Sequence, residues 1–372
     1  MTISVRPISS SEHLAFINSQ ASASFLQTPA WAKVKSEWRS ESLGFFDGTR
    51  LRGVALVLYR QLPKIKRYLA YVPEGPVLDE WSAETIAEFL EPFRDHVHRK
   101  GAFALRIGPP VVVRRWYPET IKAGIADPKA TRLRDLQPDE FVPEAVRLGA
   151  KLARLGWLPP KAGDGFAAGQ PQYVFQLPLD GKDEAATLKG MNQLWRRNIK
   201  RADKEGVEVT LGTRDDLDAF HTLYLETAER DRFTPRPVEY FRVMWDAMAA
   251  EDPDRLRLYL AHHEGDLVAA TTWVRVGEHA WYSYGASPTH KREVRGSNAI
   301  QWRMIRDAME AGATVYDLRG ITDGIGADDP EIGLIQFKVG TGGQAVELLG
   351  EWDLPLNRVL YKAFDWYLSR RG

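Results

Sequence analysis

A lysine beside a run of glycines is the most specific candidate for chemistry in this sequence. Lys338 follows an apolar stretch that ends at Phe337, and it precedes Gly340, Gly342 and Gly343. We interpret the segment as an apolar strand leading into a glycine-rich turn, so that an ammonium group would lie beside backbone amides. This arrangement suits a phosphate or a developing oxyanion. A β-turn with a surface lysine accounts for the same residues equally well.

Basic and aromatic residues also occur together at two earlier places. Arg236 and Tyr240 are four residues apart, so a helix that begins near Pro237 would turn both side chains toward one site. Lys35 follows Trp31 on a second, short predicted helix. Simple solvent exposure is the alternative interpretation of this lysine.

The segment from Lys189 to Lys204 is predicted to be a basic amphipathic helix. The segment contains a single acidic residue, Asp203, and six basic residues: Lys189, Arg196, Arg197, Lys200, Arg201 and Lys204. The predicted buried side consists of Leu194, Trp195, Ile199 and Ala202. A solvated helix surface is the plain interpretation. The concentration of arginine favours contact with a phosphate backbone instead.

Several classes of catalytic site are excluded by residue types and motifs that the sequence lacks. The chain of 372 residues contains no cysteine, which removes thiolate zinc sites, iron–sulfur clusters and cysteine nucleophiles. His96 and His98 are two residues apart and would point to different faces of a helix, so they do not predict a metal site. The sequence has no G-x-S-x-G, Walker lysine or H-E-x-x-H motif. We therefore expect neither a metal nor a cofactor.

The composition indicates a globular chain with two domains. Lys and Arg number 50, as do Asp and Glu, and 44% of the residues are hydrophobic. This balance argues against a dedicated non-specific nucleic-acid binder but leaves room for a local basic face. No apolar run approaches the roughly 18 residues of a membrane span. Together with the absence of cysteine, this predicts a cytoplasmic protein.

The elements that must position these residues occur twice in the same order. The first half predicts strands at 51–59 and 68–72, a helix at 83–98 and a strand at 102–107. The second half predicts strands at 256–262, 267–276 and 280–284, a helix at 298–310 and a strand at 314–318. This order is typical of an α+β domain, and it is similar to the N-acetyltransferase (GNAT) fold. We therefore predict two tandem GNAT-like domains.

Turn formers and a terminal helix suggest the domain boundaries. Prolines and glycines concentrate at 159–163 and 170–171, and a final helix within 355–371 has Leu356, Leu360, Phe364 and Leu368 on one face. We predict a first domain of residues 1–158 plus 354–372, with the helix packed back on it. Residues 159–353 form the second predicted domain.

The assembled motifs resemble the Fem (FemABX-like) family of aminoacyl-tRNA-dependent peptidyltransferases, which extend the stem peptide of peptidoglycan precursors. The resemblance runs in order over nearly the whole chain. The matching segments are 26–35, 71–77, 195–202, 206–207, 284–287, 316–321 and 337–353. Sustained heptads are absent, so the chain is similar to the short form that lacks a coiled-coil arm.

The resemblance implies a role for individual residues. Lys35 and Arg236 match positions that bind the precursor diphosphate, and Tyr240 and Tyr284 match aromatic positions of the precursor site. Lys338 matches the lysine near the acceptor end of the tRNA, and Asp317 lies in the strand beside it. Arg196, Arg197 and Lys200 are expected to hold the tRNA acceptor arm. The implied partners are an aminoacyl-tRNA and a muramyl pentapeptide, either nucleotide-linked or lipid-linked, and a lipid-linked acceptor implies peripheral contact with the inner membrane.

The implied reaction is direct aminolysis of the aminoacyl ester. Because the ester is already activated, the protein must supply positioning and a positive charge near the oxyanion. The positive charge is expected of Lys338, and Asp317, in the strand beside it, is the second expected catalytic residue. The amino acid moved is expected to be glycine, alanine or serine. Two departures concern the acceptor: Gly108 replaces an aspartate that is common in the family, and Thr341 replaces an aromatic residue.

Three other functions fit parts of the same sequence. The acceptor could be a non-peptidoglycan amine, as the missing aspartate at Gly108 allows. An acetyl-CoA-dependent N-acetyltransferase fits the predicted fold, but the loop 293–298 keeps one glycine and opens with Glu293, which disfavours a pyrophosphate. A non-catalytic tRNA-binding protein fits the basic helix.

Overall fold

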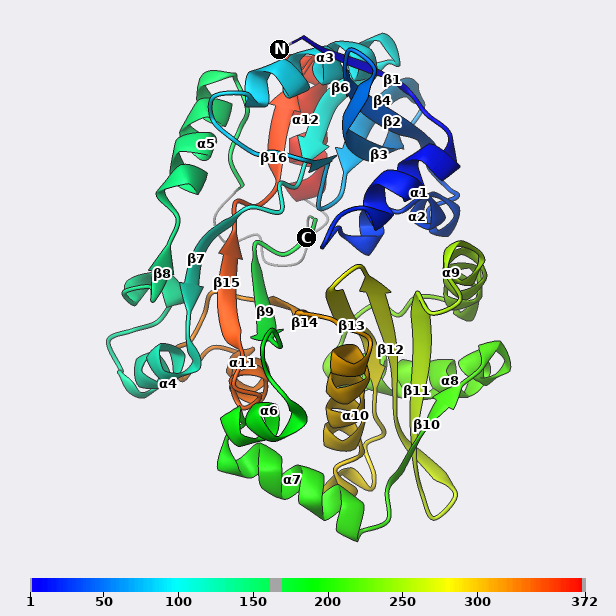
Figure 1. The fold of residues 1–372 in the computed structure, drawn as a ribbon, viewed down its shortest axis with the longest axis vertical. Coiled ribbons are helices and arrows are strands. Elements are labelled where there is room, and N and C mark those ends of the chain that lie inside the picture. The colour runs from blue at the N-terminus through cyan, green and yellow to red at the C-terminus, as the bar shows by residue number, and fades with distance from the viewer. Residues whose placement is uncertain (1, 161–168, 370–372) are drawn as a thin grey trace.

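The computed structural model describes residues 2–160 and 169–369, whose strands form two sheets (Figure 1). In the first sheet the strand order is β1-β2-β3-β4-β6-β16, with β5 paired to β3. In the second it is β10-β11-β12-β13-β14-β9-β15-β7-β8. The two sheets occupy the upper and lower halves of Figure 1, and helices pack around both.

The first sheet consists of β1 (Ile3–Pro7), β2 (Arg39–Asp47), β3 (Arg50–Leu62), β4 (Ile65–Val72), β5 (Val77–Leu78), β6 (Ala102–Ile107) and β16 (Trp352–Pro355). The second consists of β7 (Val112–Trp116), β8 (Glu140–Phe141), β9 (Tyr173–Pro178), β10 (Glu208–Gly212), β11 (Leu256–His263), β12 (Asp266–Val276), β13 (His279–Ala286), β14 (Val315–Ile321) and β15 (Gln344–Leu348). The helices are α1 (Ser10–Asn18), α2 (Pro29–Val34), α3 (Ile86–Arg99), α4 (Pro118–Ala126), α5 (Pro143–Arg154), α6 (Glu184–Gly190), α7 (Gln193–Lys204), α8 (Leu217–Asp231), α9 (Val238–Glu251), α10 (Gly296–Glu310), α11 (Ile332–Val339) and α12 (Arg358–Ser369).

Both halves repeat the predicted order of antiparallel strands, a crossover helix and a parallel strand. In the first half α3 connects the parallel pair β4 and β6, and in the second α10 connects β13 and β14. Phe89, Phe93 and Val97 recur on one face of α3, and the phenylalanines pack against Phe45 of β2. The burial of this apolar stripe fixes the crossover against the sheet.

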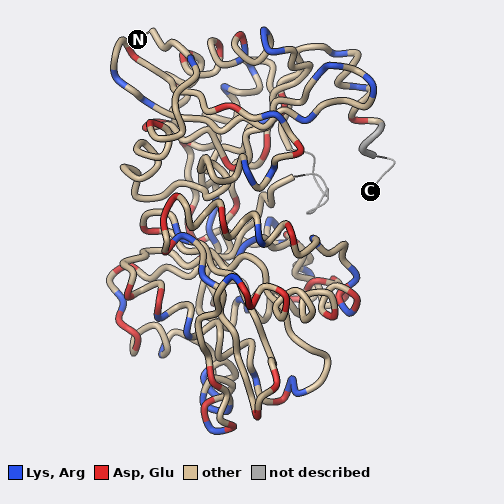
Figure 2. Tube along the Cα trace, turned by 90° about the vertical axis from the view of Figure 1, so that its right-hand side faces the viewer, with Lys and Arg blue, Asp and Glu red and all other residues tan. Residues whose placement is uncertain are grey.

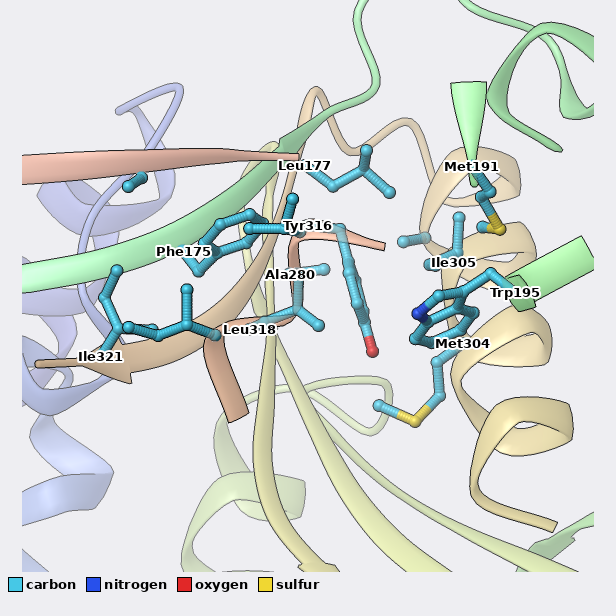
Figure 3. Close-up of a cluster of buried hydrophobic side chains, with 14 of the residues drawn as sticks. Phe175, Leu177, Met191, Trp195, Ala280, Met304, Ile305, Tyr316, Leu318 and Ile321 are labelled. Atoms are coloured by element: carbon cyan, nitrogen blue, oxygen red, sulfur yellow. The ribbon is translucent and has the colours of Figure 1, made fainter. Parts of the chain in front are cut away.

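The core of the second half lies between its sheet and helices α7 and α10 (Figure 3). Trp195 and Tyr316 lie in it together with Met304 and Ile305 of α10. The wider cluster also includes Phe175, Leu177, Met191, Ala280, Leu318 and Ile321. α7 is thus anchored at its N-terminal end.

The two halves exchange strands along the chain. β7 and β8 precede residue 158 but belong to the second sheet, where β7 pairs with β15 and β8 pairs with β7. β16 returns to pair with β6 of the first sheet. The domain boundaries drawn from turn formers remain a prediction, and residues 161–168 of the predicted seam lie outside the described residues.

α12 packs on the first sheet, as expected. Leu360 and Phe364 pack against Leu69 and Phe103, and the rings of Phe103 and Phe364 are 5.4 Å apart. The side chain of Leu368, the remaining member of the predicted face, lies outside the described part of the chain.

Two predicted elements were wrong. Lys338 does not follow a strand, because Ile332–Val339 forms helix α11. The basic segment is also not one helix, because α6 ends at Gly190 and α7 begins at Gln193, with the Asn192 side chain accepting a hydrogen bond from the Trp195 amide.

Candidate functional site

Aromatic rings surround the ammonium group of Lys35 where the two halves meet. Lys35 follows α2, and its Nζ lies 5.4 Å from the ring centre of Tyr240 on α9. The ring centres of Trp31 and Trp38 are each 5.9 Å from the same atom. The rings therefore hold the cation through their negative faces, and they come from both halves of the molecule.

The other predicted precursor-binding residues lie in the same place. α9 begins at Val238, close to the expected start, and the Arg236 guanidinium lies 5.4 Å from the ring centre of Tyr240. The hydroxyl groups of Tyr240 and Tyr284 are 3.0 Å apart. The structure thus brings together all four residues that the sequence assigned to the precursor: Lys35, Arg236, Tyr240 and Tyr284. We name them the cationic aromatic cluster.

The electrostatics of this cluster favour an anion. Burial and then the nearby charge of Arg236 lower the pKa of Lys35, while the charge of Glu37, at 4.0 Å, opposes them. Burial raises the pKa of Tyr240 well above its usual value, so this phenol remains a neutral donor. A bound phosphate would offset the repulsion between the two cations.

Lys338 lies in the last turn of α11 and is only 4% exposed. Its Nζ donates a hydrogen bond of 2.6 Å to the carbonyl oxygen of Gly320, just beyond the Arg319 position of β14. Burial lowers the pKa of Lys338 to about 7, against the opposing charge of Asp317. The group can therefore change charge near neutral pH.

Asp317 is buried and fully engaged in hydrogen bonds. Its carboxylate accepts from the amide of Arg319 at 2.6 Å and from Gln176 Nε2 at 3.0 Å, and His279 Nε2 lies 3.3 Å away. Burial pushes its pKa upward, but His279 and Arg319 more than offset this, so the pKa lies below the usual value. Asp317 is therefore an anion that orients β14 and balances the nearby cations.

Arg319 connects the Lys338 region to the first half of the molecule, and the sequence assigned it no role. Its guanidinium donates to Glu74 Oε1 and Gln170 Oε1, each at 3.1 Å, and lies 5.5 Å from the ring centre of Phe25. Its φ of 64° is unusual for a residue with a side chain. The signal in the sequence was the matched segment 316–321, which contains Arg319 but does not reveal its partner in the first half.

A buried carboxyl group near Gly108 was also missed. Glu351 Oε1 accepts a hydrogen bond of 2.6 Å from the Tyr71 hydroxyl, and Arg106 lies 3.9 Å from its other oxygen. Burial raises the pKa of Glu351 to about 7, although Arg106 and Tyr71 act against it. The Glu351 Cγ is 3.7 Å from where a Cβ at Gly108 would lie. Glu351 therefore supplies an acidic group beside Gly108, the position where the resemblance led us to expect an aspartate.

The second departure, Thr341, has a structural explanation. Its side chain is fully buried and donates a hydrogen bond of 2.6 Å to the carbonyl oxygen of Lys338. The Gly343 amide in turn donates to the threonine hydroxyl at 3.3 Å. Thr341 thus caps the end of α11 and holds the glycine-rich turn.

α7 begins next to α11, and its basic face is exposed and lies apart from the cationic aromatic cluster. Trp195 Nε1 donates to the carbonyl oxygen of Phe337 at 2.8 Å, so α7 begins beside Lys338. Arg197 and Lys200 are exposed, but Arg196 donates to the carbonyl oxygens of Lys189 and Met191 and is thereby partly engaged. The expectation that Leu194 is buried was wrong, since it is 55% exposed.

The described residues contain no group of three or more His, Asp or Glu side chains that could hold a metal ion. The helix that would bind a pyrophosphate in an acetyltransferase, α10, begins at Gly296. A Cβ at Gly296 would lie 3.1 Å from the carbonyl oxygen of Val268. This glycine therefore allows close packing of helix on strand.

Comparison with protein families gives one match over most of the chain. A model described as the FemAB family matches residues 8–263 and 258–367. A protein named lipid II:glycine glycyltransferase from Staphylococcus aureus (strain MRSA252) is 24% identical, and the alignment covers 96% of this chain and 94% of the relative.

Solved structures agree with this match at the level of the fold. The crystal structure of FemX superposes with a TM-score of 0.81 at 22% identity, covering 96% of this chain and 99% of FemX. A tandem GNAT protein from the clavulanic acid biosynthesis pathway gives a TM-score of 0.50 at 12% identity, covering 94% and 98%. L-PGS from Bacillus licheniformis gives 0.53 at 11% identity, covering 98% and 97%. These likenesses confirm the predicted tandem GNAT-like fold.

Proposed function

Because the chain belongs to the FemAB family and is a transferase, we propose that it moves an amino acid from an aminoacyl-tRNA to the stem-peptide amine of a peptidoglycan precursor. The family match agrees with the resemblance inferred from the sequence motifs. Relatives named for lipid II and glycine support a muramyl peptide on a diphosphate as acceptor and a small amino acid, such as glycine, alanine or serine, as the group transferred.

The observation that carries this proposal is the cationic aromatic cluster formed by both halves. Lys35 comes from the first half, Arg236 and Tyr240 from the second, and both cations lie 5.4 Å from the same ring centre. Arginine can hold a phosphate through two parallel hydrogen bonds, while lysine acts as a point charge. Two adjacent phosphates of a precursor match this pair of cations.

The donor end of the reaction is proposed to lie at Lys338. The amine of the acceptor attacks the ester carbonyl, a C–N bond forms, and the C–O bond to the ribose breaks as the amine proton passes to the leaving oxygen. An ammonium at Lys338 stabilises the developing oxyanion or the terminal phosphate of the tRNA. Asp317 is proposed to orient β14 beneath it, since its carboxylate bonds the Arg319 amide at 2.6 Å.

The tRNA acceptor arm is proposed to lie along the basic face of α7. Arg197 and Lys200 are exposed on this face, and Trp195 fixes its start beside Phe337 and therefore beside Lys338. Contacts with the phosphate backbone would make binding sensitive to salt. Arg196 contributes mainly by joining α7 to the end of α6.

Mass spectrometry of the transfer products tests the proposal directly. The protein is incubated with a pool of charged tRNAs and either a nucleotide-linked or a lipid-linked muramyl pentapeptide. The expected result is an acceptor heavier by one amino-acid residue, whose mass identifies the amino acid. If neither acceptor gains mass while the protein is folded and the tRNA remains charged, the proposal is wrong.

A further inference from the structure

Two apolar side chains on the outer side of α12 are exposed to solvent in the described part of the chain. Leu360 and Phe364 form its inner side, whereas Val359 is 77% exposed and Trp366 is 57% exposed. Val359 and Trp366 are seven residues apart, so they lie on the same face of the helix. Between them lies the exposed Lys362. A helix with this division of residues is typical of segments that lie in a membrane interface.

The hairpin between β3 and β4 adds exposed positive charge beside α12. Its tip has Ile65, 47% exposed, next to the exposed Lys64, Lys66 and Arg67. In the described part of the chain no carboxylate pairs with these three cations. Leu62 of the hairpin packs on the same cluster as Phe364, so the hairpin and α12 are neighbours. Figure 2 marks Lys and Arg in blue and Asp and Glu in red along the chain, and both kinds of charge are spread over the two halves.

Arg60 and Trp38 link the inner side of α12 to the cationic aromatic cluster. The Arg60 guanidinium lies 5.9 Å from the ring centre of Phe364 on α12 and 5.7 Å from that of Trp38. The Trp38 ring centre is in turn 5.9 Å from Lys35 Nζ. Arg60 and Trp38 therefore lie between α12 and the proposed phosphate-binding lysine.

We propose that α12 and the β3–β4 hairpin form a docking surface for an anionic phospholipid bilayer. The surface consists of Lys64, Ile65, Lys66, Arg67, Val359, Lys362 and Trp366. Tryptophan favours the level of the lipid headgroups, and lysine and arginine are attracted by anionic ones. This orientation places Lys35 near the headgroup layer, where a lipid-linked diphosphate would emerge. That last consequence rests on the proposed function, whereas the binding of lipid does not.

Flotation of the full chain with vesicles tests the docking surface. Vesicles of equal parts phosphatidylglycerol and phosphatidylcholine are compared with vesicles of phosphatidylcholine alone, and the protein is expected to float only with the anionic ones. Each removed charge should lower partitioning about fivefold. The triple variant Lys64→Gln, Lys66→Gln, Arg67→Gln is therefore expected to lose on the order of a hundredfold.

A matched control removes three charges from α7 instead. The variant Lys200→Gln, Arg201→Gln, Lys204→Gln should float as well as the unmodified protein, because it leaves the docking surface intact. Equal loss in both triple variants would mean that net charge alone determines binding and would overturn the proposal. Absence of flotation with anionic vesicles would do the same.

The apolar part of the surface is tested by Val359→Ser and Trp366→Ser together. The double variant should lose vesicle binding while its oligomeric state, measured by analytical ultracentrifugation, is unchanged. A dimer that becomes a monomer in this variant would show that a second copy covers the helix, and the proposal would be wrong.

An activity measurement separates this inference from the proposed function. The same double variant should transfer an amino acid to a nucleotide-linked acceptor normally and to a vesicle-embedded lipid-linked acceptor poorly. Normal transfer to both acceptors would contradict the docking surface. Absence of transfer by the unmodified protein would count against the proposed function, while the flotation result would still decide the binding of lipid.

Discussion

At the scale of single residues, the charge of Lys338 gives the clearest test of chemistry. Burial lowers its pKa to about 7, and its Nζ is held by the Gly320 carbonyl oxygen at 2.6 Å. A cation that stabilises an oxyanion acts only in its protonated form, so its contribution is present below pH 7 and is lost as the pH rises through about 7. We expect kcat/KM for aminoacyl-tRNA to decline along that limb, because this parameter reports the free enzyme.

The variant Lys338→Met should lower kcat by about 100- to 1000-fold and remove this alkaline limb. Lys33→Met is the matched control, since Lys33 is exposed on α2 and should leave both rate and pH profile unchanged. A Lys338→Met enzyme that retains the same profile would show that another group titrates there.

Gly108 makes a prediction about stability. A Cβ there would lie 2.9 Å from the backbone nitrogen of Glu74, whose carboxylate holds Arg319. Gly108→Ala should therefore reduce the free energy of unfolding by about 1–3 kcal/mol, measured by urea denaturation. Gly333→Ala in α11 is the control, because a Cβ at Gly333 would lie within 4 Å of no neighbouring atom. Its free energy of unfolding should stay equal or rise by about 0.5–1 kcal/mol. An unchanged midpoint for Gly108→Ala would mean that the Glu74 backbone moves freely.

The sequence predicted the cationic aromatic cluster but not the contact that joins the Lys338 region to the first half. The spacing of Arg236 and Tyr240 is a local pattern, and the two side chains lie together in the structure as it predicted. Lys35 and Tyr284 were predicted from the family resemblance. Arg319 and Glu74 are 245 residues apart, and so are joined only by the packing of the two halves. No local pattern encodes such a pair.

At the scale of elements, α7 makes a prediction about tRNA. Arg197→Gln with Lys200→Gln should weaken tRNA binding, and the slope of log affinity against log salt should fall by about 1 for each phosphate that the protein no longer neutralises. Titration at several salt concentrations measures both effects. The control variant Lys64→Gln with Lys66→Gln removes the same number of charges from the β3–β4 hairpin, which lies away from α7. It should change neither the affinity for tRNA nor the salt dependence. Equal weakening in both pairs would indicate a diffuse electrostatic effect.

The pattern of apolar residues before Lys338 was too short to distinguish a helix from a strand. The apolar run Ile332 to Ile335 is short, and its branched residues suit a strand as well as a helix. Ile335 and Val339 pack into the core of the second half, so one side of α11 is buried. This packing favours the helix over a strand. The longer elements were predicted within a few residues, since α3 and α10 have several turns of consistent pattern.

At the scale of the whole molecule, the exchange of strands was beyond sequence reasoning. β7 and β8 join the second sheet although they follow β6 of the first, and β15 pairs with both β7 and β9. Such pairings depend on contacts between distant segments and not on local propensity. The repeated order of elements indicated two similar halves, but it could not show which strands cross between them.

The exchange and the shared core predict that the two halves unfold as one unit. Met248 of α9 is fully buried in a cluster that includes Leu56 of β3 and Val274 of β12, and the Glu251 carboxylate binds the Ala30 amide at the start of α2. Met248→Ala should therefore destabilise both halves by about 2–5 kcal/mol. Hydrogen exchange should show protection falling together in β3 and β12, and unfolding should remain a single transition.

Phe364→Ala provides the comparison, because among the described residues the cluster around Phe364 consists of residues of the first sheet and α12. Its effect on exchange should be greatest in α12, β4 and β6, with β12 losing protection only through global unfolding. If Met248→Ala instead lowered protection in β12 while β3 kept its original value, the two halves would be independent folding units. The cationic aromatic cluster would then form only when they dock, and its affinity for an anion would depend on that docking equilibrium.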